Sequence, residues 1–94
     1  MIIDFKDKET EKIWNHQLSK KIPKDITKRA LDKLYRIHTS SNIEDLRTPP
    51  SNHLEKLQGD REGQYSIRIN QQWRICFVWT DNNNAKNVEI IDYH

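Results

Sequence analysis

The side chains best suited to chemistry lie in the second half of the chain. Arg68 and Arg74 are close in sequence, and Asp92, Tyr93 and His94 follow further on. An arginine guanidinium is planar, permanently charged and forked, so it binds phosphate well. Cleavage of a phosphodiester in RNA needs positive charge on the phosphate, a base for the 2′-hydroxyl and an acid for the 5′-oxygen. These residue types favour RNA cleavage as the candidate chemistry.

Each of these residues also has an ordinary structural interpretation. Two arginines can form a solvated surface with carboxylate partners, a tyrosine can cover a sheet, and a residue at a chain end is often frayed. His53 and Glu55 lie two positions apart, so on a strand they would point the same way and could join the arginines. Catalysis and plain surface structure both stay open on these grounds.

Other classes of chemistry lack their motifs. The sequence has no glycine-rich nucleotide loop, no Walker motif, no paired cysteines and no His-Glu-x-x-His. Its one cysteine, Cys76, lies among large hydrophobic residues, which predicts an inert thiol in a reducing compartment. We therefore expect no cofactor and no metal. Because a signal peptide and a membrane-length apolar run are also missing, we expect a cytoplasmic protein that does not enter a membrane.

Alternating apolar residues predict a hairpin that carries the two arginines. Each strand has one apolar face, formed by Tyr65, Ile67 and Ile69 in the first strand and by Ile75, Phe77 and Trp79 in the second. Burial of both faces in an antiparallel pair predicts the partners Ile69–Ile75, Ile67–Phe77 and Tyr65–Trp79. This register places Arg68 and Arg74 together on the opposite face, where a phosphate could reach both.

The last strand is predicted around Val88 and Ile90. Alignment of these two residues with Trp79 and Phe77 places Tyr93 opposite Arg74, on the arginine face.

Shorter elements are predicted elsewhere. Met1–Phe5 is typical of an edge strand or of the start of a strand, and His53–Leu57 of a short strand. Asp60–Gly63 has the form of a type I turn. Ser41 followed by Glu44 has the spacing of a capping box for a single helical turn.

Two helices are predicted in the first half of the chain. Asp7 can cap a helix that ends near Ser19 and turns Thr10, either Ile13 or Trp14, and Leu18 inward. A second helix begins at Pro23, ends near His38, and has its inward positions at Ile26, Ala30, Leu34 and Ile37. Basic residues gather where this helix begins, at Lys20, Lys21, Lys24 and Lys28. They form either a solvated helix face or a surface that binds RNA phosphate. The net charge of +2 does not distinguish between these two interpretations.

These elements indicate one domain over residues 1–94 with an α+β fold. Two N-terminal helices pack on a twisted, mainly antiparallel sheet of about four to five strands.

The run from Ile43 onward resembles the HigB toxins of the RelE superfamily. The most specific parts of the resemblance are residues 59–63, the pair Trp73 and Arg74, and residues 92–94. It implies a RelE-like fold and a toxin of a type II toxin-antitoxin system that cuts mRNA in the ribosomal A site. It also implies an antitoxin of the helix-turn-helix HigA type, and we expect the free toxin to be monomeric.

The resemblance suggests roles for individual residues. It assigns catalysis to Asp92, Tyr93 and His94, and it places Glu55 where many HigB toxins have a histidine. We add Arg74 to the catalytic set, and we assign RNA phosphate binding to Arg68, His53 and the four lysines named above. Glu55, Asp92 and His53, in that order, are the candidate bases. The competing hypothesis is a binding protein without catalysis, which inhibits translation by occupying the ribosome.

Overall fold

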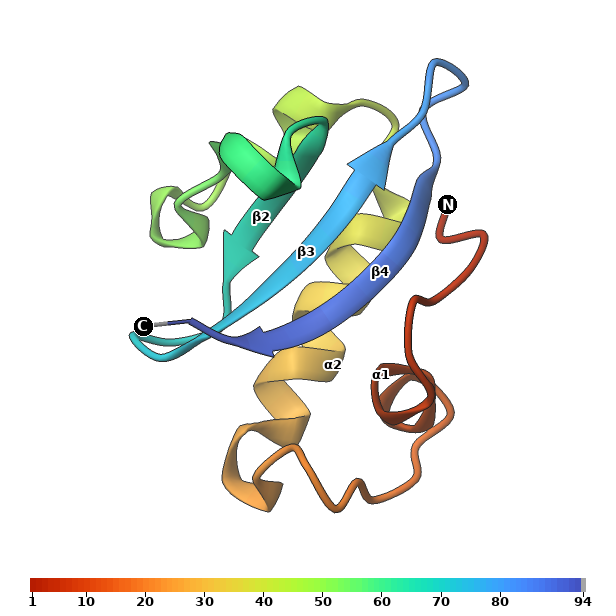
Figure 1. Ribbon diagram of the computed structural model, residues 1–94, viewed down its shortest axis with the longest axis vertical. Coiled ribbons are helices and arrows are strands. Elements are labelled where there is room, and N and C mark those ends of the chain that lie inside the picture. Colours follow the sequence, from red (N-terminus) through yellow and green to blue (C-terminus); the bar gives the residue numbers. More distant parts are fainter. Residues whose placement is uncertain (94) are drawn as a thin grey trace.

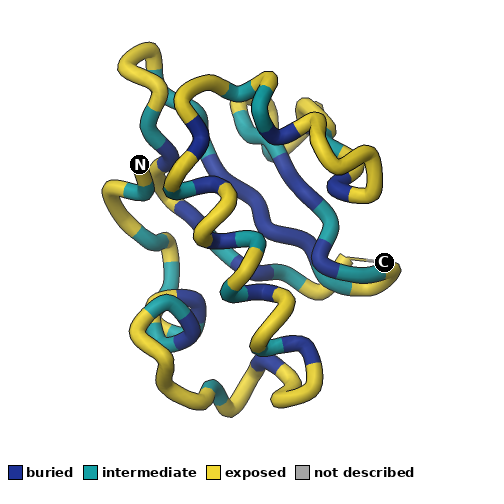
Figure 2. The backbone as a smooth tube through the Cα atoms, turned by 180° about the vertical axis from the view of Figure 1, so that it is seen from behind, coloured by how far each residue is buried: buried dark blue, intermediate teal, exposed yellow. Residues whose placement is uncertain are grey.

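The computed structural model describes residues 1–93, and in it two helices cover one face of an antiparallel sheet (Figures 1 and 2). The helices are α1 (Lys8–Trp14) and α2 (Lys24–Thr39). The strands β1 (Glu55–Lys56), β2 (Gln64–Arg68), β3 (Trp73–Trp79) and β4 (Ala85–Asp92) lie side by side in that order. This arrangement confirms the predicted α+β fold. The other face of the sheet is left for the arginines.

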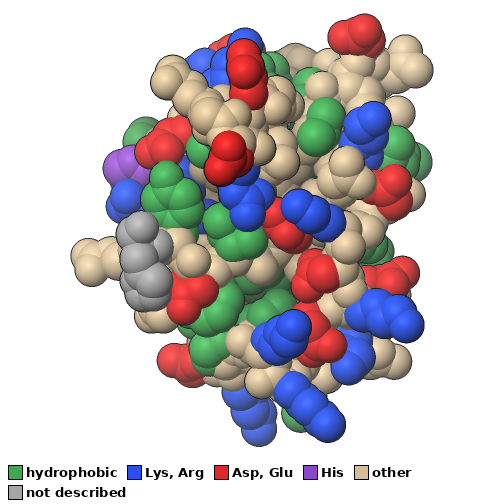
Figure 3. All heavy atoms as spheres, in the orientation of Figure 1, with side chains coloured by type: hydrophobic (Ala, Val, Ile, Leu, Met, Phe, Trp, Pro, Cys, Tyr) green, Lys and Arg blue, Asp and Glu red, His purple; other side chains and the backbone are tan. Residues whose placement is uncertain are grey.

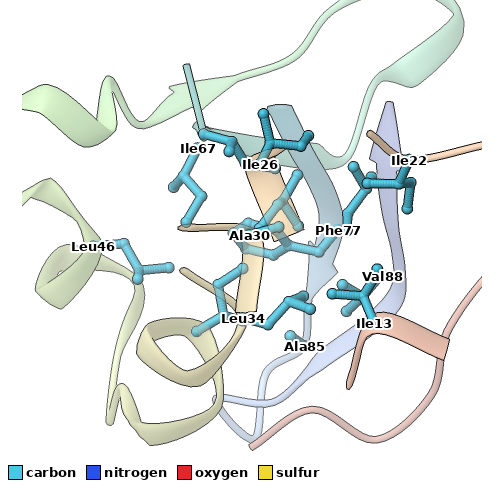
Figure 4. Close-up of a cluster of buried hydrophobic side chains, with 14 residues drawn as sticks. Ile13, Ile22, Ile26, Ala30, Leu34, Leu46, Ile67, Phe77, Ala85 and Val88 are labelled. Carbon is cyan, nitrogen blue, oxygen red and sulfur yellow. The ribbon is translucent and has the colours of Figure 1, made fainter. Parts of the chain in front are cut away.

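Helix α2 contributes four buried side chains to the hydrophobic core. Ile26, Ala30, Leu34 and Ile37 are all buried, as their helical spacing predicts. Pro23 is the residue before the helix rather than its first member. Figure 4 shows side chains of α2 meeting those of the strands, among them Ile67 and Phe77.

Helix α1 is shorter than its pattern predicts. Asp7 caps it by accepting a hydrogen bond from Thr10 N at 3.4 Å, and Thr10 and Ile13 are buried as expected. The expected end near Ser19 is wrong, because the chain enters a left-handed conformation at His16 (φ 63°) directly after the helix. Leu18 is consequently 67% exposed and not a core residue.

The segment after α2 contains short 3₁₀ turns. The first, Ile43–Arg47, has its capping box at Asn42 and Asp45, one residue later than the predicted Ser41 and Glu44. Asn42 Oδ1 accepts a hydrogen bond from Asp45 N, and Asp45 Oδ2 accepts one from Asn42 N, so the two residues cap the turn reciprocally.

The strand predicted for His53–Leu57 has only two residues, Glu55–Lys56. Its start is displaced because His53 adopts φ 45° at the end of the turn Pro50–Asn52. A further 3₁₀ turn, Gly59–Arg61, replaces the predicted type I turn at Asp60–Gly63.

The hairpin β2–β3 has a register two residues away from the predicted one. Ile67 pairs with Ile75, and Arg68 lies directly opposite Arg74. The shift follows from the turn: Asn70 Oδ1 accepts hydrogen bonds from Gln72 N and Trp73 N, both at 2.8 Å, and closes the loop early. A shift of two residues leaves each side chain on its predicted face.

Strand β4 is also displaced by two residues from its predicted alignment near the arginines. Ile90 pairs with Ile75, and Ile91 rather than Tyr93 pairs with Arg74. The predicted alignment is wrong because the buried Ala85 already pairs with Trp79, so the loop before β4 is shorter than predicted. An irregularity between Cys76 and Val78 interrupts the pairing.

The first residues lie along the outer edge of β4. Ile2 and Phe5 make isolated parallel bridges to Ala85 and Val88, so this segment covers the sheet edge without forming a continuous strand. Within residues 1–93, none of the helices has the length and apolarity to cross a membrane.

Candidate active site

Arg74 is held in place by hydrogen bonds on the sheet face that the helices do not cover. Its side chain is 4% exposed and reaches Ser66 on the neighbouring strand β2. Nε donates to Ser66 Oγ at 2.9 Å and Nη2 donates to the His53 carbonyl oxygen at 2.7 Å. These two neutral acceptors satisfy part of the donor set of the buried Arg74 side chain. Its guanidinium is oriented before any ligand binds.

Two further charges flank that guanidinium. Arg68 lies directly opposite Arg74 in the hairpin and is half-buried. Glu55 pairs with Ser66 on the neighbouring strand, and its Oε1 lies 3.9 Å from Arg74 Nη1. The Glu55 side chain is 50% exposed, so this ion pair is loose and open to solvent. A carboxylate beside a fixed guanidinium combines a candidate base with a candidate phosphate ligand.

Tyr93 also lies next to Arg74, and with Arg68 and Glu55 it forms the cluster around that guanidinium. Its ring centroid lies 5.4 Å from Arg74 Cζ, and its N–H donates to the Gln72 carbonyl oxygen at 2.6 Å. The end of β4 therefore lies beside the turn of the β2–β3 hairpin (Figure 1). Tyr93 lies on the arginine face, as predicted, although diagonal to Arg74 rather than opposite it. Its ring, with the residue 42% exposed, offers a surface on which a base can stack.

Asp92 is separated from that cluster. It pairs with Trp73, which places it on the sheet face opposite to Arg74 and Tyr93. Its Oδ2 accepts a hydrogen bond from Gln72 Nε2 at 3.2 Å. His94 lies outside the described residues. Of the two described terminal residues assigned to catalysis, Tyr93 lies next to Arg74 and Asp92 does not.

His53 contributes to the site in two ways. Its backbone carbonyl holds Arg74, while its exposed side chain lines a pocket together with Arg68. The expectation that His53 and Glu55 share one strand face is wrong, because His53 precedes the strand in a left-handed conformation.

Three residues of this face were not predicted. Ser66 positions Arg74, and its alternation with the apolar residues of β2 was the available signal. Arg61 Nη1 donates to Glu89 Oε1 at 2.6 Å, and this bond raises the pKa of Arg61. Arg61 and Glu89 are far apart in the sequence, so no local sequence pattern predicts their contact. Cys76 lies beside them, and burial raises the pKa of its thiol to about 11, in agreement with an inert cysteine.

The predicted RNA-binding lysines all lie on the surface. Lys20, Lys21, Lys24 and Lys28 are exposed around the start of α2. Figure 3 shows basic side chains projecting from this lower end of the molecule. Their exposure agrees with an outward helix face, and their contact with RNA stays a prediction. In residues 1–93, the His, Cys, Asp and Glu side chains form no group of three or more that could hold a metal.

Comparison with known proteins identifies the family. The family model for the RelE-like toxin HigB of type II toxin-antitoxin systems matches residues 3–94. The chain belongs to the HigB-like toxins.

Individual relatives agree with this assignment. This HigB-like toxin is 38% identical to Toxin HigB-1 of Vibrio cholerae over 85 residues, which is 86% of either chain. It is 33% identical to Endoribonuclease HigB of Proteus vulgaris over 94 residues, the full length of both. Among solved structures, it resembles a chain of the heterotetrameric YoeB-YefM toxin-antitoxin complex from Staphylococcus aureus. The TM-score is 0.62 at 22% identity, with 100% of this chain and 98% of that chain covered. This second likeness supports the fold.

Proposed function

We propose that this HigB-like toxin is an endoribonuclease that cuts mRNA in the ribosomal A site. The full-length relative named Endoribonuclease HigB supports RNA cleavage. The observation that carries the proposal is Arg74, which is almost fully buried and yet has its guanidinium beside an exposed aromatic ring and an exposed carboxylate. A cation held in this way stabilises charge that develops in a transition state, because it needs no reorganisation when the reaction occurs.

Arg74 retains the donors that this role requires. A guanidinium has about five N–H donors, and the hydrogen bonds to Ser66 and His53 use Nε and one position on Nη2. The remaining N–H groups bind the non-bridging oxygens of the scissile phosphate. Arg68, directly opposite, binds the same or the adjoining phosphate. Tyr93 stacks on a neighbouring base and keeps the single strand in register.

The acid-base steps follow from what surrounds the phosphate. Glu55 takes the proton of the 2′-hydroxyl, since its carboxylate lies 3.9 Å from Arg74 Nη1 and is open to solvent. The 2′-oxygen then attacks phosphorus, the bond to the 5′-oxygen breaks, and an acid protonates that leaving oxygen. His94 is the proposed acid. The products are a 2′,3′-cyclic phosphate and a 5′-hydroxyl. Asp92 is less suited to act as the base because it lies on the other face.

The partners of the toxin follow from its family and its fold. We propose an antitoxin of the helix-turn-helix HigA type, and a cytoplasmic location, where translating ribosomes are found. Two solved structures with a similar fold are YoeB-YefM complexes from Staphylococcus aureus.

Mapping of RNA ends in cells that express the toxin tests this function. The proposal predicts new 5′ ends inside translated reading frames and none in untranslated RNA. Ribosomes stalled on intact messages would instead establish the competing hypothesis of inhibition by occupancy. Cells that express Arg74→Ala serve as the control, and their RNA ends and ribosome positions are subtracted as background.

A further inference from the structure

We infer that a basic pocket between α2 and the β2–β3 hairpin binds a second phosphodiester of the RNA strand that is cut at Arg74. The pocket has a volume of about 420 Å³ and is lined by Arg29, Lys33, Ser51, His53, Arg68, Ile69, Asn70 and Gln71. This inference rests on the proposed endoribonuclease function and names where the same strand continues.

The charges of the pocket favour an anion. Arg29, Lys33 and Arg68 are basic, His53 can become so, and none of the eight described lining residues is acidic. Like charges brought together in a hollow repel one another, and a bound phosphate relieves that repulsion. Ser51 and the two amide side chains supply neutral donors on the remaining wall. The volume falls within the range of about 300–1,000 Å³ that is usual for small-ligand sites.

Two of the basic groups are held in place by the protein. Lys33 Nζ donates to Oδ1 of the fully buried Asn52, whose Nδ2 in turn donates to the carbonyl oxygens of Leu46 at 3.1 Å and Thr48 at 3.3 Å. Arg29 Nη1 donates to the Ile69 carbonyl oxygen at 3.5 Å. Partial burial, and then the positive charges of Arg29 and Arg36, lower the pKa of Lys33. Its side chain is therefore held in place near the positive charges of Arg29 and Arg36, with Asp32 as an opposing negative charge, before RNA arrives.

Arg68 joins the pocket to the cleavage face. It lines the pocket and also lies opposite Arg74 across the hairpin. Asn52 and His53 make a second connection, because Asn52 holds Lys33 while the next residue's carbonyl oxygen holds Arg74. A strand whose scissile phosphate contacts Arg74 thus has its adjoining phosphate at the pocket. Lys33 and Arg29 set the position of the strand and take no part in the bond changes.

A titration with an uncleavable RNA tests this inference. The probe is a 2′-O-methylated uridine trinucleotide, which lacks the attacking hydroxyl, and binding is followed by amide NMR shifts at several salt concentrations. The wild type is compared with Arg29→Gln/Lys33→Met and with the matched control Lys8→Gln/Lys86→Gln. The control removes two exposed lysines that do not line the pocket, Lys8 of α1 and Lys86 of β4, the strand at the opposite edge of the sheet from β1. Arg29→Gln alone serves as a second variant, because Lys33→Met also leaves Asn52 with one hydrogen bond fewer.

The expected result is loss of the shifts at Ser51, Asn70 and Gln71 in the double variant. Loss of the one phosphate held in the pocket lowers the magnitude of the salt slope of log K by about 0.7 on a single strand, so between about 50 and 200 mM salt the wild type loses about 2.6-fold more affinity than the variant. The control keeps the wild-type slope. Inorganic phosphate alone, as a further probe, binds more weakly than the trinucleotide.

Three results would overturn the inference: wild-type slope and shifts in both pocket variants, an equal loss in the control, or inorganic phosphate that binds as tightly as the trinucleotide. The titration requires no cleavage. If the pocket does not bind the second phosphate, the wild-type toxin should still cleave RNA. If the proposed endoribonuclease function is wrong, the wild-type toxin should not cleave RNA at all.

Discussion

Replacement of Arg74 by Ala should nearly abolish cleavage without unfolding the toxin. The guanidinium is already aimed by Ser66 and His53, so its loss removes one preorganised charge from the transition state. Removal of such a donor lowers kcat by roughly 10²–10³-fold, or about 2.7–4 kcal/mol. KM should change less, because Arg68 still binds the RNA.

The same substitution also has a cost in stability. The buried hydroxyl of Ser66 loses its partner, which costs about 1–3 kcal/mol. A toxin of this size should remain folded at that cost, and urea denaturation measures it. Arg74→Lys separates the two effects: the positive charge stays, but an ammonium lacks the fork that reaches both Ser66 and His53. We expect its cleavage rate to lie between those of the wild type and Arg74→Ala.

Cleavage is assayed as single-turnover cutting of a message on purified ribosomes. Arg47→Ala is the matched control, because Arg47 is an exposed arginine whose described ion pair is with Glu44 alone. It should cut at the wild-type rate. Arg74→Ala protein that is folded by circular dichroism and cuts as fast as this control would refute the role assigned to the fixed guanidinium.

The remaining predictions concern the base, the cysteine and a turn. Glu55→His should still cleave, but the acidic limb of its pH–rate profile should move upward, because histidine titrates near about 6.5 and glutamate near about 4.3; an unmoved limb excludes Glu55 as the base. The raised pKa of Cys76 means that the folded state holds this proton more tightly. The free energy of unfolding should therefore fall between about pH 9 and 11, by at most about 2.7 kcal/mol, and Cys76→Ala should lack that part of the fall in urea titrations. Gly63→Ala, at φ +91°, should cost about 1–2 kcal/mol in urea denaturation, whereas no loss would mean that the turn relaxes.

Periodicity was a reliable guide to which face each side chain occupies. The inward residues of α2, and the shared face of Arg68 and Arg74, follow from spacing alone, because side-chain direction repeats with the helix or strand. Even a register error of two residues kept the arginines together, since two is the period of a strand.

Contacts that depend on loops were not predictable in the same way. The turn at Asn70 is closed by one side chain accepting two backbone hydrogen bonds, and this detail decides the hairpin register. The left-handed backbone at His53 likewise redirects that residue, so its carbonyl oxygen rather than its ring serves Arg74. Asp92 faces away for a simple reason: strand alternation separates it from its neighbour Tyr93.

The most direct test of the account is cleavage of a defined message in a purified translation system. A ribosome is stalled with a known codon in the A site, the toxin is added, and the RNA ends are mapped and their termini identified. The account predicts one cut within that codon, a 2′,3′-cyclic phosphate on the upstream fragment, and no cut when ribosomes are omitted or Arg74 is replaced by Ala. An intact message on a ribosome that the toxin still inhibits would contradict it.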